Sequence, residues 1–296
     1  MKNILPYNLF LEKQLEIPFP DLKKSSLDLW LENAIDIIQK DCKPFISELR
    51  KEFMDSPVEM EKQDNIYHKA NRSKVLWRGF YLKDEDKIVP PLMVERDTNK
   101  EGNITFTGGK SMDTYNFGKK TVRSNRRSAD MPEEVNDYFD QSFIKYFDFY
   151  PRSNGAFCTG SRRMADGYGT PYLVFPIGEY KYIWSQQVSD LYDYTEKTMW
   201  FAYTFDPDGV VNDIRDGYAN PENLKWYNEK MTDEEIHNRL EKMVDDNIDE
   251  IVNTYESNDL KRAIDSGNEI TLNCKEYYAI SFHPKLIEEF YNGVII

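Results

Sequence analysis

Val75-Leu76-Trp77-Arg78-Gly79-Phe80 is a short apolar strand that carries an arginine and a glycine near its end, and the character of the sequence changes there. Before it, residues 1–70 are predicted to be mainly helical. After about residue 74, apolar strands alternate with turn-rich loops. We therefore predict an N-terminal helical region over residues 1–70 and an α+β domain over residues 71–296.

Several elements are predicted from apolar spacing and capping residues. Leu27, Trp30, Leu31, Ala34, Ile35 and Ile38 have helical spacing behind the candidate caps Ser25 and Ser26, and a second amphipathic stretch runs from Pro44 to Phe53. Further helices are predicted over 161–168, after the candidate cap Asp130, and after the capping box that begins at Thr232. Strands are predicted over 75–82, 88–94, 156–159, 171–177, 180–185, 269–272 and 277–282, and a loop over about 205–230.

The composition is that of a folded globular protein, with 40% hydrophobic and 14% aromatic residues in 296. No run approaches the roughly 20 apolar residues that span a bilayer, and the first residues do not resemble a signal peptide. The three cysteines (Cys42, Cys158, Cys274) lie far apart, which is typical of buried residues in a reducing compartment, so we expect a cytoplasmic location. No Cys/His spacing indicates a metal site.

Charge is distributed unevenly along the chain. The net charge of −14 argues against nucleic acid as a partner, because phosphate contacts need clustered Lys and Arg. Residues 119–127 nevertheless form a basic run, and Arg152, Arg162 and Arg163 flank a Ser/Thr segment. These arginines suit a dinucleotide pyrophosphate in a cleft, while a solvated basic loop is an equal reading of residues 119–127.

Two later segments extend the pattern that begins with Arg78. Arg152-Ser153-Asn154-Gly155-Ala156-Phe157-Cys158-Thr159-Gly160 leads into an aromatic strand with Ser and Thr, and Gly267-Asn268-Glu269-Ile270-Thr271-Leu272 opens a strand with a glutamate. This order resembles the Arg–Ser/Thr–Glu constellation of ADP-ribosyltransferases, which cleave NAD at the nicotinamide–ribose bond. The resemblance covers about residues 74–282.

The resemblance implies a fold, a substrate and a set of site residues. The implied fold is a core of two small, mainly antiparallel sheets that frame a cleft, with NAD as the substrate and a protein as the expected acceptor. Glu269 matches the catalytic glutamate, Arg78 the arginine that contacts the NAD phosphates and ribose, and Tyr168 the tyrosine beside the nicotinamide pocket. The implied catalytic residues are Glu269, Arg78 and Thr159, and the implied NAD-binding residues are Arg78, Gly79, Ser153, Phe157, Thr159 and Tyr168.

The chain departs from the family pattern at two places. Arginine-modifying members carry Glu or Gln two positions before the catalytic glutamate, where this chain has Gly267. An arginine acceptor is therefore in doubt, and NAD glycohydrolysis is an alternative to transfer. The first serine position of the middle motif is ambiguous between Ser153 and Cys158.

Other readings of the same residues stay open. Arg78 could be a salt-bridged strand residue, Thr159 a simple strand former and Glu269 a solvated strand start. Asp190 could touch substrate or only cap the turn after the strand. The alternative function is a non-enzymatic binding or virion-associated protein that retains the fold. The acidic, Tyr-rich composition would suit a phage protein, which would then be located in the host cytoplasm. A third function, a nucleic-acid modifier, is disfavoured by the net charge.

Overall fold

The computed structural model describes residues 25–53, 74–96, 111–124, 126, 131, 133–195, 202–204, 206–218, 225–283 and 286. Within them, eight strands form one sheet in the order β4-β10-β6-β1-β5-β9-β7-β8, and β2 pairs with β3 in a second, two-stranded sheet. The strands of the large sheet are β1 (Leu76–Gly79), β4 (Phe117–Thr121), β5 (Ala156–Thr159), β6 (Pro171–Pro176), β7 (Lys181–Ser185), β8 (Tyr255–Glu256), β9 (Glu269–Asn273) and β10 (Glu276–Ser281). The small sheet contains β2 (Leu92–Arg96) and β3 (Ser111–Tyr115).

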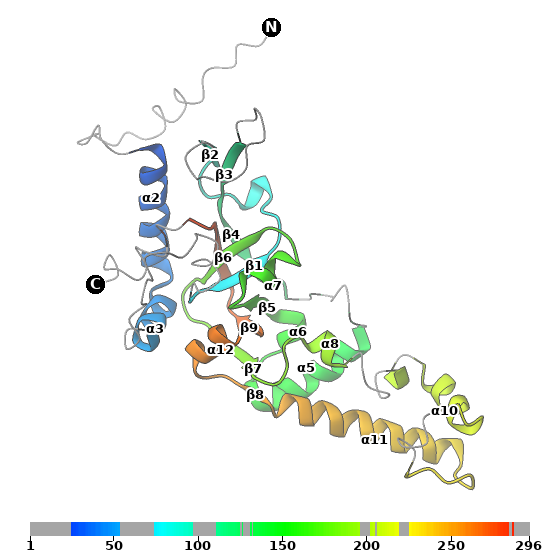
Figure 1. Ribbon diagram of the computed structural model, residues 1–296. Coiled ribbons are helices and arrows are strands. Elements are labelled where there is room, and N and C mark those ends of the chain that lie inside the picture. Colours follow the sequence, from blue (N-terminus) through cyan, green and yellow to red (C-terminus); the bar gives the residue numbers. More distant parts are fainter. Residues whose placement is uncertain are drawn as a thin grey trace.

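The helices lie on two sides of the large sheet (Figure 1). They are α2 (Ser26–Asp41), α3 (Lys43–Phe53), α5 (Glu133–Phe147), α6 (Pro151–Asn154), α7 (Arg162–Asp166), α8 (Leu191–Thr195), α10 (Pro207–Arg215), α11 (Asp233–Val252) and α12 (Leu260–Ser266). α2 and α3 run along one side, while α11 extends away from the sheet with α10 at its far end (Figure 1).

Every described strand pair is antiparallel, and the register places the three predicted motifs side by side. β1 pairs with β5 so that Trp77 lies opposite Thr159, and β5 pairs with β9 so that Thr159 lies opposite Glu269. The strand that ends in Arg78-Gly79 is therefore two strands away from the strand that begins with Glu269. Segments almost 200 residues apart in the sequence meet at one end of three neighbouring strands.

The buried side chains form two clusters. One joins the central strands to α2, α3 and α12, and includes Trp77 and Phe45, both fully buried. The other lies among α5, α10 and α11 and reaches the sheet through Ile183 and Tyr255. Because α2 and α3 share their core with the sheet, the described part of the N-terminal helical region packs as one unit with the strands.

Capping chemistry explains where the long helices begin. Ser25 and Asp28 form a reciprocal capping box at the start of α2, and Thr232 and Glu235 do the same at the start of α11. Both starts agree with the sequence predictions. The candidate cap Asp130 lies outside the described residues, although the helix predicted after it is present as α5.

The antiparallel α+β prediction is confirmed, but several details differ. The predicted pair of small sheets is instead one sheet of eight strands and one of two. The strand predicted over 88–94 begins at Leu92, directly after Pro90 and Pro91, which have no N–H to donate to a strand ladder. The basic run is not simply a loop, since residues 117–121 form β4 and pair with β10.

The loop predicted over about 205–230 was also wrong in part. Pro207–Arg215 is a helix, α10, although its sequence contains Pro, Gly, Asn and Asp. Pro207 occupies the first turn, where its missing N–H costs nothing, and the Asp206 side chain accepts a hydrogen bond from the Gly209 N–H at 2.9 Å. Val210, Val211 and Ile214 are buried in the second core cluster, so tertiary packing outweighs the weak local propensity.

The three cysteines are free thiols and all three are buried, as predicted. Burial raises the pKa of both Cys158 and Cys274 to about 12, so neither is a thiolate near neutral pH. None of the described helices has both the length and the apolar character that crossing a membrane requires.

Candidate functional site

A cavity of about 790 Å³ lies where β1, β5 and β9 meet α7 and the loop before α8. It contains six of the predicted site residues, namely Arg78, Gly79, Phe157, Thr159, Tyr168 and Glu269. It also contains residues to which the sequence gave no firm role: Arg126, Arg152, Cys158, Met164, Ala165, Gly167, Ser189, Asp190, Tyr192 and Asp193.

Glu269 is held at the first position of β9. Its backbone N–H donates to the Ser189 carbonyl at 2.9 Å, and its Oε1 accepts from Arg152 Nη1 at 3.2 Å. The side chain is 15% exposed. Burial raises the pKa of Glu269 above its ordinary value, because the loss of hydration outweighs the attraction of Arg152, and Asp190 raises it further.

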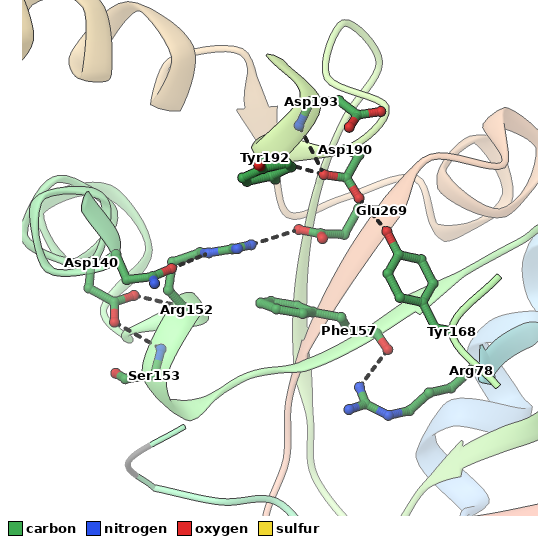
Figure 2. Close-up of polar contacts among 11 residues, drawn as sticks. Arg78, Asp140, Arg152, Ser153, Phe157, Tyr168, Asp190, Tyr192, Asp193 and Glu269 are labelled. Atoms are coloured by element: carbon green, nitrogen blue, oxygen red, sulfur yellow. Dashed lines mark hydrogen bonds and ion pairs between the residues drawn. The ribbon is translucent and has the colours of Figure 1, made fainter. Parts of the chain in front are cut away.

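Arg152 is the principal partner of Glu269. Its side chain is only 4% exposed, and its Nε donates to Asn136 Oδ1 at 3.1 Å. Its backbone N–H donates to Asp140 Oδ1 at 2.7 Å, which fixes α6 against α5 (Figure 2). A buried guanidinium with this many partners is a rigid support for the carboxylate.

Arg78 lies at the opposite side of Phe157 from the Glu269–Arg152 pair as drawn in Figure 2, where its Nη1 donates to the Phe157 carbonyl at 2.6 Å. Its Nε is buried and has no hydrogen-bond partner within the described part of the chain. The next residue is Gly79. A Cβ at this position would lie 1.9 Å from the Ala165 carbonyl oxygen, so only glycine lets α7 approach β1 this closely.

Thr159 links the two strands that carry the site. Its Oγ1 donates to the Gly267 carbonyl at 2.6 Å and accepts from the Ser161 N–H at 3.0 Å. The hydroxyl is therefore used to hold the turn that precedes Glu269, and the geometry makes Thr159 a positioning residue.

Ser153 does not line the cavity. Its backbone N–H donates to Asp140 Oδ2 at 2.9 Å, and its carbonyl accepts from the Arg126 N–H at 2.9 Å. Ser153 thus holds the backbone of Arg126 next to the cavity. Phe157 does line the cavity, and its ring contacts both Arg126 and Arg152.

Tyr168 and Asp190 both line the cavity and contact each other. Tyr168 is 60% exposed, and its hydroxyl donates to Asp190 Oδ2 at 2.7 Å. Asp190 Oδ1 accepts from the backbone N–H groups of Tyr192 and Asp193, so Asp190 also caps the turn into α8. The sequence left two readings of Asp190 open, and the structure places it both at the cavity and at the cap.

In the sequence, Arg126 belongs to the basic run 119–127 and Arg152 flanks the Ser/Thr segment, and both were predicted only to suit a pyrophosphate in a cleft. Their position at the site depends on α6 and on the chain after β4, and no local spacing connects either residue to Glu269. The sequence shows that both residues are charged, but it does not show that they lie close to Glu269.

The cavity brings three guanidinium groups together with one partly buried glutamate and with an aspartate bound to a tyrosine. Such a set can bind an anion through its guanidinium groups and stabilise a developing positive charge through its carboxylates. Among the described residues, no group of three or more His, Cys, Asp or Glu side chains is arranged to hold a metal ion. No family model, curated protein or solved structure matches this chain.

Proposed function

We propose that the protein cleaves NAD at the nicotinamide–ribose bond and transfers ADP-ribose to a macromolecular acceptor, with release of nicotinamide. One observation carries the proposal: the three motifs that resemble ADP-ribosyltransferases lie on the neighbouring strands β1, β5 and β9 and open into one cavity. The resemblance was drawn from sequence order alone, and their adjacency in space is independent support.

The chemistry of each group fits its proposed role. Glu269 can accept a hydrogen bond from the ribose 2′-hydroxyl and favour the positive charge that develops at C1′ as nicotinamide leaves. Arg78 offers a permanently charged planar fork for the phosphate oxygens. Thr159 keeps Glu269 in place through the Gly267 carbonyl, which supports catalysis because small misplacements of a catalytic group reduce the rate strongly. The cavity volume lies in the range of small-molecule sites.

The acceptor is limited by Gly267. Its φ of +71° is in the left-handed region, and it ends α12 just before Glu269. A side chain there would be strained, so this position cannot readily carry the Glu or Gln that engages an arginine acceptor. The proposal therefore favours an acceptor other than arginine, and water gives the NAD glycohydrolase variant.

A non-enzymatic binding protein is the second candidate, and the Arg152–Glu269 ion pair favours it. A carboxylate engaged by a buried guanidinium is less available to a ribose hydroxyl than a free one. Binding without turnover would use the same cavity and the same arginines.

Nicotinamide release from NAD separates these functions. We would measure it for the wild type and for Glu269→Gln, with cell lysate supplied as acceptor and without it. Glu276→Gln is the matched control, because Glu276 lies at the start of β10 in an exposed ion pair with Lys119 and does not line the cavity.

The enzyme proposal expects release by the wild type and by Glu276→Gln, and loss of nearly all release in Glu269→Gln, measured at a temperature at which a melting curve shows that the variant is still folded. Equal release by Glu269→Gln would reject the assignment of the catalytic residue. The binding proposal expects no release from any variant, together with a rise in melting temperature when NAD is added.

A further inference from the structure

Arg126 and Arg152 both contact the ring of Phe157. The guanidinium carbon of Arg126 lies 3.9 Å from the ring centroid, and that of Arg152 lies 4.4 Å from it. Arg126 reaches this position because its backbone N–H is bound to the Ser153 carbonyl next to Arg152. The aromatic ring offers both guanidinium groups a cation–π contact.

The three cavity arginines differ in what they bind. Arg152 donates to Glu269 and Asn136, and Arg78 donates one bond to the Phe157 carbonyl. Arg126 Nη1 and Arg78 Nε are buried and lack hydrogen-bond partners within the described ranges. Buried donors of a charged group without partners are costly, and they mark where an acceptor would be most stabilising.

The electrostatics of the cavity agree with this reading. Burial and the nearby charges of Arg78 and Arg152 lower the pKa of Arg126 to about 10. Each of these causes disfavours the positive charge, while Glu269 opposes them only in part. This end of the cavity therefore has too little negative charge for its arginines.

We propose that Arg126 and Arg78 together form a binding site for a diphosphate group, with Arg126 as a second phosphate-holding residue that the family resemblance does not supply. Arg152 is already bound to Glu269, so the diphosphate is left to Arg78 and Arg126. The inference rests on the proposed function, since it places the diphosphate of a dinucleotide beside Phe157. Phosphate oxygens can accept from both guanidinium groups, and two cations match the two charges of the diphosphate.

Calorimetric titration with ADP tests the site without any need for turnover. We would compare the wild type with Arg126→Met, which keeps side-chain length and removes the charge. Arg123→Met is the matched control, because Arg123 is an exposed member of the same basic run and does not line the cavity. Adenosine and inorganic phosphate serve as further probes that separate recognition of the nucleoside from that of a free anion.

The proposal expects ADP to bind at least about tenfold more weakly to Arg126→Met, the effect of losing charged hydrogen bonds. Arg123→Met should bind ADP as the wild type does, and adenosine should bind equally to all three. Arg126→Lys should be intermediate, because it retains the charge without the planar fork. Thermal unfolding of each variant shows that the comparison is made on folded protein.

Three results would overturn the site: no ADP binding by the wild type, the same ADP affinity in Arg126→Met as in Arg123→Met, or an equal loss for ADP and adenosine. Tighter binding of inorganic phosphate than of ADP would assign the site to a free anion and would also overturn it. The two proposals can fail separately. ADP binding that depends on Arg126, without nicotinamide release, would support the diphosphate site and reject the enzyme proposal. Nicotinamide release together with ADP binding that does not depend on Arg126 would support the enzyme proposal and reject the diphosphate site.

Discussion

Removal of Arg152 should destabilise the protein mainly through the carboxylate that it leaves behind. In Arg152→Met, Glu269 keeps its place in the cavity wall but loses a guanidinium donor at 3.2 Å. At an effective dielectric constant of about 20, the direct attraction at this distance is about 5 kcal/mol. Breaking a buried pair by removing one partner typically costs 3–5 kcal/mol. Arg78 and Arg126 also attract Glu269, so we expect the lower end, about 3 kcal/mol.

Urea unfolding at pH 7 measures this cost. With a slope near 3 kcal/mol per molar urea, the midpoint should fall by about 1 M. The exposed Arg163→Met on α7 serves as the control and should shift it little. The double variant Arg152→Met with Glu269→Gln should recover about 1–2 kcal/mol, because a neutral amide is far cheaper to bury than an unpaired carboxylate. If the double variant loses as much unfolding free energy as the two single variants together, the argument is refuted, because the unpaired Glu269 carboxylate would then not be the cause of the instability.

Two other predictions concern the same carboxylate. Burial raises the pKa of Glu269 above 4.5, so nicotinamide release should decline on the acid side at a pH above 4.5, as a pH–rate profile would show. For the same reason, the neutral form of Glu269 favours the folded state. Relative to Glu269→Gln, the stability of the wild type should be greatest below pH 4.5 and should decline as the pH rises through the raised pKa. A stability difference that does not change with pH would contradict this. Thr159→Val leaves the Gly267 carbonyl and the Ser161 N–H without this partner, so it should cost about 2 kcal/mol in urea unfolding and reduce the rate of nicotinamide release, whereas Thr121→Val at the exposed end of β4 should do neither.

Local signals predicted most of the regular structure. The caps at Ser25 and Thr232 and the helical spacing behind them gave the starts of α2 and α11, because capping depends on residues within one turn. The strand predicted over 156–159 coincides with β5, and the strand predicted from Glu269 coincides with the start of β9. These short apolar runs are bounded by glycine and polar residues, which makes their limits visible.

The remainder depended on contacts that no local pattern contains. α10 forms on a sequence rich in turn residues because its three apolar side chains find a core supplied by α5 and α11. The two small sheets expected from the resemblance are one large sheet and one small one, since β7, β9 and β5 pair continuously with β1 and β6. The sequence suggested a pyrophosphate partner for these arginines but not the approach of Arg126 and Arg152 to Glu269, because that approach follows from the packing of α6. Ser153 binds the Arg126 backbone and does not line the cavity.

The connections around Glu269 also determine which part of the cavity wall can move. Asn268 Nδ2 donates to the carbonyls of Ser185 and Gln186, and the Glu269 N–H donates to that of Ser189. The segment after β7 and the start of β9 are thus fastened together at three points. Within the described part of the chain, the Tyr168 side chain is joined to this unit by its hydrogen bond to Asp190. Tyr168 is therefore the less firmly held part of this cavity lining and Glu269 the more firmly held part.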